Sequence, residues 1–219
     1  MAGAQVTRSR TGLSREGVAL VALELLDRDG PEALSMRRLA EELGAGTMTL
    51  YGYFRNKDEL LDAVIDAGFA EFEPPAPAPD PLRELRDLML AARDVLHRHP
   101  ALVQIRRAGP IVRPRGFAIT ELTLRLLTRA GVEPGDAARV FRVLFDYVFG
   151  YALVNPRAPS PELRREALDS IGALPAERFP AVKAVAGDMA EAVAGAGQFE
   201  FGLDVILAGI AARAVSAQP

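Results

Sequence analysis

The chain has 219 residues, of which 49% are hydrophobic and none is cysteine, and its formal net charge is −3. This length and hydrophobic content support a small domain joined to a larger one without disulfides or metals, and the lack of cysteine excludes thiol nucleophiles and cysteine zinc sites. No basic segment followed by an apolar run opens the chain and no stretch of about 18 apolar residues occurs, so we expect a cytoplasmic protein without a signal peptide or membrane span.

Apolar residues recur at helical spacing through the first seventy residues. Ser14 and Ser35 are suitable N-caps, and Asn56 opens a variant of the capping box. Gly30 and Gly44 are placed to end the first two helices. Four helices are therefore predicted, over Ser14–Asp29, Met36–Leu43, Thr47–Tyr53 and Lys57–Phe72.

The clearest boundary follows at Glu73–Pro81, where five of nine residues are proline. Such a segment cannot be a continuous helix and is typical of a stiff extended connector. Pro175–Gly197 is rich in alanine and glycine, and its pattern assigns no element. Six further helices are predicted over Leu82–His99, Ala101–Ala108, Arg113–Ala130, Pro134–Val154, Ser160–Leu174 and Gln198–Val215.

No alternating strand pattern and no internal repeat occurs, so the predicted fold is all-α. An N-terminal three-helix domain over 1–72, with its core at 13–60, precedes the connector at 73–81. The larger helical domain takes up 82–219. This division places a small N-terminal domain before a domain that is large enough to have its own hydrophobic core.

Two short helices joined by a turn containing Gly44 and Gly46 predict a helix-turn-helix. Burial of Ala40, Leu43, Leu50 and Phe54 against the first helix would leave the start of the second short helix exposed. Residues at that position of a recognition helix reach base edges in the major groove.

The side chains at this end suit DNA. Thr47 can hydrogen-bond a base or contact a thymine methyl, Met48 offers apolar contact, and Arg37 can bind guanine through two hydrogen bonds. Between Ser35 and Lys57 four basic residues outnumber two acidic ones. Other side chains in this region carry hydrogen-bond donors that can bind the phosphates of the DNA backbone. The predicted DNA-contacting residues are Ser35, Met36, Arg37, Thr47, Met48, Thr49, Tyr51, Tyr53 and Lys57.

The stretches LSMRRLAEELG at 34–44 and TLYGYFRNKDELL at 49–61 resemble the DNA-binding domain of the tetracycline-repressor (TetR) family. The resemblance runs from about Leu13 to Phe72 without gaps. A second stretch, FEFGLDVILAGI at 199–210, is similar to the last helix of the tetracycline-repressor subgroup itself. The resemblance implies a homodimeric regulator, most simply a repressor, that binds a palindromic double-stranded DNA operator.

In that family the C-terminal domains form a four-helix dimer interface. The resemblance assigns it to Arg139–Val154 and Gln198–Val215, whose patterns offer apolar faces. We expect the partner subunit to contact Val140, Val143, Leu144, Phe201, Val205 and Ile206.

The resemblance also implies one ligand pocket per subunit and a small-molecule inducer. Positions near the family's pocket-lining ones are Leu90, Gln104, Thr123, Leu124 and Tyr147. Gln104 and Glu73 stand where tetracycline repressors carry histidines, and a neutral amide is a poor ligand for a divalent cation. We therefore expect an inducer other than magnesium–tetracycline, and no metal or cofactor.

Two other classes of protein were weighed. An enzyme is not expected, because the chain lacks a Gly-rich phosphate loop, a nucleophile elbow and a metal-ligand cluster. The alternative is a helical ligand-binding or interaction protein without specific DNA binding. Gly52 favours that alternative, because glycine weakens a helix by roughly 1 kcal/mol relative to alanine.

Overall fold

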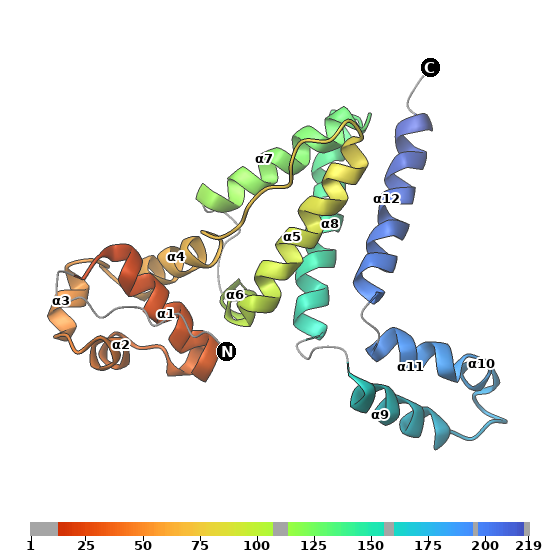
Figure 1. Ribbon diagram of the computed structural model, residues 1–219, viewed down its shortest axis with the longest axis horizontal. Helices are drawn as coiled ribbons and strands as arrows, with labels where there is room; N and C mark the ends of the chain where they lie inside the picture. Colours follow the sequence, from red (N-terminus) through yellow and green to blue (C-terminus); the bar gives the residue numbers. More distant parts are fainter. Residues whose placement is uncertain (1–12, 107–113, 156–159, 195–196, 217–219) are drawn as a thin grey trace. The chain divides into compact units, whose positions relative to one another are not determined.

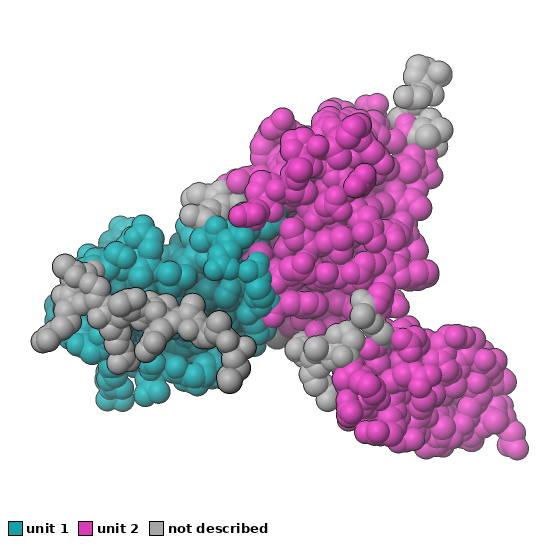
Figure 2. Space-filling view, viewed as in Figure 1, with its two compact units in different colours: residues 1–72, 98–116 teal, residues 73–97, 117–219 magenta. Residues whose placement is uncertain are grey.

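The computed structural model describes residues 13–106, 114–155, 160–194 and 197–216 (Figure 1). Within these ranges the chain contains helices and turns but no strand, which confirms the all-α prediction. It divides into two compact units, Met1–Phe72 with Arg98–Gly116 and Glu73–His97 with Phe117–Pro219 (Figure 2). The first unit is drawn in teal and the second in magenta.

The first unit begins with α1 (Arg15–Asp29), which starts and ends where its capping residues predict. The Ser14 hydroxyl oxygen accepts a hydrogen bond from the Gly17 amide at 3.0 Å, satisfying one of the free N–H groups at the helix start. Gly30 ends the helix with a φ of 81°, which glycine adopts without strain. Val18, Ala22 and Leu25 are fully buried along one face.

Two short helices follow, α2 (Met36–Leu43) and α3 (Thr47–Tyr51), after a 3₁₀ turn at Pro31–Ala33. Ser35 caps α2 by accepting from the Arg38 amide at 3.1 Å, and Gly44 ends it in the left-handed conformation. The third helix is two residues shorter than predicted, because Gly52 closes it and Tyr53 lies in the turn beyond.

The fourth helix, α4 (Lys57–Gly68), begins with the Asn56 side chain accepting from the Glu59 amide at 2.8 Å. It ends at Gly68 rather than at Phe72 as predicted. It packs against α1, and Leu50, Phe54 and Leu60 are completely buried in this unit. This core fixes α2 and α3 as a helix-turn-helix.

The short helix α6 (Pro100–Arg106) packs with the first unit, although the sequence places it after the connector. The Asp27 carboxylate of α1 accepts from the Ala101 amide at 3.0 Å and lies 2.8 Å from His99 Nδ1. Leu102 is buried against Gly68 of α4. These contacts explain why Arg98–Gly116 belongs to the first unit, although the preceding stretch of that unit ends at Phe72, where the proline-rich connector begins.

The second unit contains the long helices α5 (Pro81–Arg98), α7 (Pro114–Arg129), α8 (Pro134–Val154) and α12 (Gln198–Ser216). Phe199, Leu203 and Leu207 of α12 are buried. Ion pairs of 2.6 Å join Arg93 to Glu200 and Arg86 to Asp204, so polar contacts hold α12 to α5. Phe199 stacks on Tyr147 of α8, with 5.1 Å between the ring centres.

The proline-rich connector is held by two side chains of the second unit. The buried Glu84 carboxylate accepts from the Ala78 amide at 3.0 Å, and Arg129 donates to the Ala78 carbonyl at 2.8 Å. Arg129 also contacts Glu84 at 2.8 Å. The backbone N–H and C=O groups of Ala78 are thus both hydrogen-bonded, although Ala78 lies outside any helix.

The segment that the sequence left unassigned contains α10 (Pro180–Ala184) and α11 (Ala186–Ala194). These helices pack against α9 (Pro161–Gly172), with Arg164 bound to Glu191 at 3.0 Å. In the described ranges no single helix is long and apolar enough to cross a membrane; α11 and α12 taken together would pass on length and composition alone.

Candidate DNA-binding site

The start of α3 presents an exposed surface of the helix-turn-helix. Leu50 points inward and is fully buried, whereas 81% of Met48 and 45% of Tyr51 are exposed. Thr49 is exposed and Thr47 is half-buried. The side chains of α3 that are predicted to contact DNA are thus accessible from solvent.

The start of α2 adds a cation to this surface. The Arg37 side chain is 85% exposed, and its nearest carboxylate is that of Glu41, 3.8 Å away. This exposed pair one helical turn apart is weak and leaves the guanidinium free to take other partners. Ser35 is exposed and uses its oxygen as the helix cap, while Met36 is half-buried.

Two predicted contacts have partners inside the protein. The Tyr53 hydroxyl donates to the Leu13 carbonyl, and the Lys57 ammonium donates to the Leu34 carbonyl at 2.7 Å. Lys57 keeps two further N–H donors and stays exposed, so a phosphate can still bind it. The Tyr53 hydroxyl, in contrast, has its donor proton engaged.

A charged network that the sequence did not indicate surrounds the end of α3. Arg15 donates to the Tyr53 carbonyl at 2.6 Å and to Glu59 at 3.0 Å, and its guanidinium lies 4.5 Å from the centre of the Phe54 ring. Arg55 donates to Glu59 from its amide and its side chain. The hydrogen bonds from Arg55 and then Arg15 lower the pKa of Glu59 from 4.5 to about 2.

The predicted ligand-lining residues fall in different units. Gln104 is exposed in the first unit, and the other four belong to the second. Thr123 is buried and donates to the Ile119 carbonyl at 2.8 Å. The Tyr147 hydroxyl donates to the Phe199 carbonyl at 2.9 Å, and burial raises the pKa of Tyr147. Leu90 and Leu124 are half-buried.

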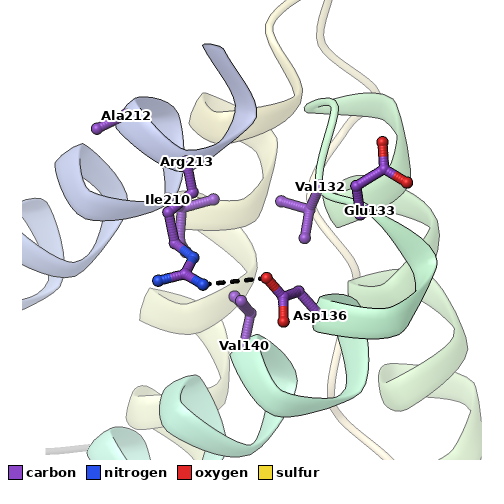
Figure 3. Close-up of a pocket in the computed structure, with 7 residues that line it drawn as sticks. All are labelled: Val132, Glu133, Asp136, Val140, Ile210, Ala212 and Arg213. Carbon is purple, nitrogen blue, oxygen red and sulfur yellow. Dashed lines mark hydrogen bonds and ion pairs between the residues drawn. The ribbon is translucent and has the colours of Figure 1, made fainter. Parts of the chain in front are cut away.

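The predicted dimer surface forms a groove between α8 and α12. Val143, Phe201 and Val205 are more than half exposed, whereas Val140 and Ile206 are half-buried in the groove wall. At one end Arg213 of α12 reaches Asp136 of α8 at 3.0 Å (Figure 3).

The expectation for Leu144 is wrong. This side chain is 1% exposed and lies on the buried face of α8 with Ala137, Val148 and Ala152. The neighbouring Val143 is about 100° away around the helix and faces outward. The predicted contact face of α8 therefore included one residue that lies inside the subunit.

A helix-turn-helix with an exposed third helix, in a chain that also contains a larger helical unit, is typical of a DNA-binding regulatory protein. Sequence comparison supplies the family. The description "Bacterial regulatory proteins, tetR family" matches residues 20–64, and "Tetracyclin repressor-like, C-terminal domain" matches residues 75–214. The chain therefore belongs to the TetR family of transcriptional regulators.

Comparison with individual relatives and solved structures agrees with this family assignment. A helix-turn-helix transcriptional regulator from Saccharopolyspora erythraea is 32% identical over 66% of this chain, and the match spans 61% of that relative's length. The class A tetracycline repressor from transposon 1721 of Escherichia coli is 31% identical over 93% of both chains. Apo ActR from Streptomyces coelicolor superposes with a TM-score of 0.80 at 30% identity, covering 96% of this chain and 100% of ActR. ActR has also been solved with actinorhodin.

Proposed function

We propose that the protein is a homodimeric repressor that binds a palindromic operator and leaves it when a small molecule binds. The observation that carries the proposal is the exposed start of α3, held by a buried core of Leu50, Phe54 and Leu60. A recognition helix must present side chains in a fixed direction, and a fully buried support provides this. Such a protein acts where the DNA is, in the cytoplasm.

The side chains divide into those that read bases and those that hold the backbone. Thr47, Met48 and Arg37 are exposed or half-exposed and suit base edges. Thr49 and Tyr51 carry hydroxyl donors for phosphates, and Ser35, Met36 and Lys57 flank them. Because Tyr53 donates inside the protein, we assign it no base contact.

The exposed apolar groove between α8 and α12 supports dimerisation. Val143, Phe201 and Val205 would lose their exposure to water against the same face of a second copy. A two-fold axis then sets two recognition helices one DNA turn apart, roughly 34–36 Å, or farther for a longer site. The operator is accordingly an inverted repeat.

We propose an inducer other than magnesium–tetracycline, because Gln104 offers a neutral amide where the resemblance implies a histidine. The ActR complex with actinorhodin supports a small-molecule ligand for this fold. An inducer must prefer one of two protein states, since equal affinity for both moves no equilibrium.

The test is selection of duplexes from a random pool with the full chain. The proposal predicts enrichment of one inverted repeat. Phe201→Asp with Val205→Asp should give a monomer in sedimentation and lose the repeat's affinity. Leu20→Asp, at a 48% exposed leucine of α1, is the control and should remain a dimer.

If the wild-type chain enriches no sequence, the alternative applies: a helical ligand-binding or interaction protein without specific DNA binding. If the chain enriches single half-sites and sediments as a monomer, the dimer part of the proposal is wrong while DNA recognition stands.

A further inference from the structure

The turn that follows α3 is held by side chains from two other helices. Arg15 of α1 donates to the Tyr53 carbonyl of this turn at 2.6 Å. Glu59 of α4 accepts from the Arg55 amide at 2.9 Å and from the Arg55 side chain at 3.1 Å. Arg15 and Glu59 also contact each other at 3.0 Å. One hydrogen-bonded cluster therefore joins α1, the turn and α4.

Glu59 does more in this cluster than stabilise the start of its own helix. In a capping box the third helical residue accepts a hydrogen bond from a backbone amide at the helix start, and Glu59 does so through Oε2, with the Arg55 amide as donor. The Asn56 side chain in turn accepts from the Glu59 amide at 2.8 Å. The other oxygen, Oε1, is bound by Arg15, 44 positions earlier in the chain. Capping does not require this second contact.

The direction of α3 has to be set from outside that helix. The helix has five residues, and a helix this short is unstable alone. It begins after Gly46, which has no side chain with which to cap it. Burial of Leu50 and Phe54 fixes its inner side, but hydrophobic burial is non-directional. The hydrogen bonds at the turn are directional, so they can determine the angle at which the helix lies.

We propose that Glu59 is a positioning residue for DNA recognition, which fixes the end of α3 through Arg15 and Arg55. The exposed start of the same helix, with Thr47 and Met48, then meets base edges at a defined angle, as specific recognition requires. This inference rests on the proposed DNA binding and deepens it. Glu59 is an anion and makes no favourable contact with phosphates, so its contribution is to the discrimination between sequences.

This role predicts two opposite effects of Glu59→Gln. The variant loses a negative charge from the first unit, so it should bind a duplex of mixed sequence at least as tightly as the wild type. It also weakens the bonds from Arg15 and Arg55, because a neutral amide oxygen is a weaker acceptor than a carboxylate. The ratio of the affinity for the selected duplex to that for the mixed duplex should therefore fall about tenfold, the discrimination that one base contact supplies.

Fluorescence anisotropy with the full chain measures both affinities, on the duplex selected from the random pool and on an equally long duplex of mixed sequence. The temperature is one at which circular dichroism shows each variant to be folded. Asp58→Asn is the matched control, because it removes an equal charge from the neighbouring, exposed position of α4. It should leave the ratio of affinities unchanged. If Glu59 only stabilised the fold, Glu59→Gln would lower the melting temperature and leave this ratio as in the wild type, which would overturn the proposal.

Arg15→Gln tests the route from Glu59 to the turn. It removes the donor that contacts both Glu59 and the Tyr53 carbonyl, so it should also lower the ratio of affinities. In the double variant the ratio should fall by less than the product of the two separate falls, because both changes break the same cluster. A fall equal to that product contradicts the route through Arg15. Should Glu59→Gln fail to fold, an unchanged ratio in Arg15→Gln overturns the proposal by itself.

The outcomes separate this inference from the proposed function. A wild-type chain that binds both duplexes equally overturns the proposed function together with the positioning role. A wild-type chain that distinguishes the duplexes, with a ratio of affinities that Glu59→Gln leaves unchanged, overturns the positioning role alone.

Discussion

Replacing Gly68 with alanine should lower the free energy of unfolding by about 1–2 kcal/mol, although alanine is the better helix former. A β-carbon at Gly68 would lie 2.7 Å from Cδ1 and 2.9 Å from Cδ2 of Leu102, whose side chain is 2% exposed. Overpacking of this kind costs roughly 1–3 kcal/mol. The gain in helix propensity offsets at most about 1 kcal/mol of that cost, and less at the last residue of a helix.

Urea unfolding followed by circular dichroism measures the effect, and a double-mutant cycle assigns its cause. Leu102→Ala alone should cost about 2–5 kcal/mol. In that background Gly68→Ala should be neutral or stabilising by up to about 1 kcal/mol, because the obstructing methyl groups are gone. Gly172→Ala is the matched control, since Gly172 also ends its helix and has no atom within 4 Å of the added carbon. An equal effect of Gly68→Ala in both backgrounds would refute the packing argument between α4 and α6.

Three further predictions test the site and the core. Glu41→Gln should tighten operator binding about twofold to fivefold in anisotropy titrations, because it frees Arg37 and removes an anion near the phosphates; unchanged or weaker binding contradicts this. Glu59→Gln should reduce the loss of stability as the pH falls from 4.5 to about 2. A carboxyl group whose pKa is lowered by folding stabilises the protein above its unfolded-state pKa, and this stabilisation is lost as the pH falls through its folded-state pKa. The urea midpoint, measured at several pH values in this range, tests the prediction. A midpoint that falls with pH as steeply as in the wild type would contradict the role given to the Arg55 and Arg15 contacts. Leu144→Ala should cost about 2–5 kcal/mol in urea unfolding of the dilute monomer, whereas Val143→Ala, at a 52% exposed position, should stay within about 0.5 kcal/mol.

Helix starts were predictable from sequence where the cap is local. Ser14, Ser35 and Asn56 each accept from a backbone amide three residues ahead, and each helix begins at the following residue. Helix ends were less predictable. Apolar spacing continues beyond Tyr51 and Gly68, but glycine at or beside the end of each helix makes continuation weak, and periodicity alone does not register that cost.

The membership of α6 in the first unit was not predictable, because the contacts that determine it are distant in sequence. Asp27 has no pattern that marks it as the acceptor for the Ala101 amide, 74 residues away. The first unit does end at Phe72, immediately before the prolines at 73–81, but nothing in the local sequence shows that Arg98–Gly116 returns to it.

The same reasoning explains which parts of the DNA-binding surface the sequence could define. Residue types and helix phase placed Met48 and Tyr51 on the exposed side of α3 and Leu50 inside, because both depend on local geometry. Which donors remain free depends on long-range hydrogen bonds. The bond from Tyr53 to Leu13 spans 40 residues and the bond from Lys57 to Leu34 spans 23. A hydroxyl or ammonium that the fold already uses has fewer donors left for DNA. We therefore expect the specificity of the protein to depend on the donors that remain free after folding.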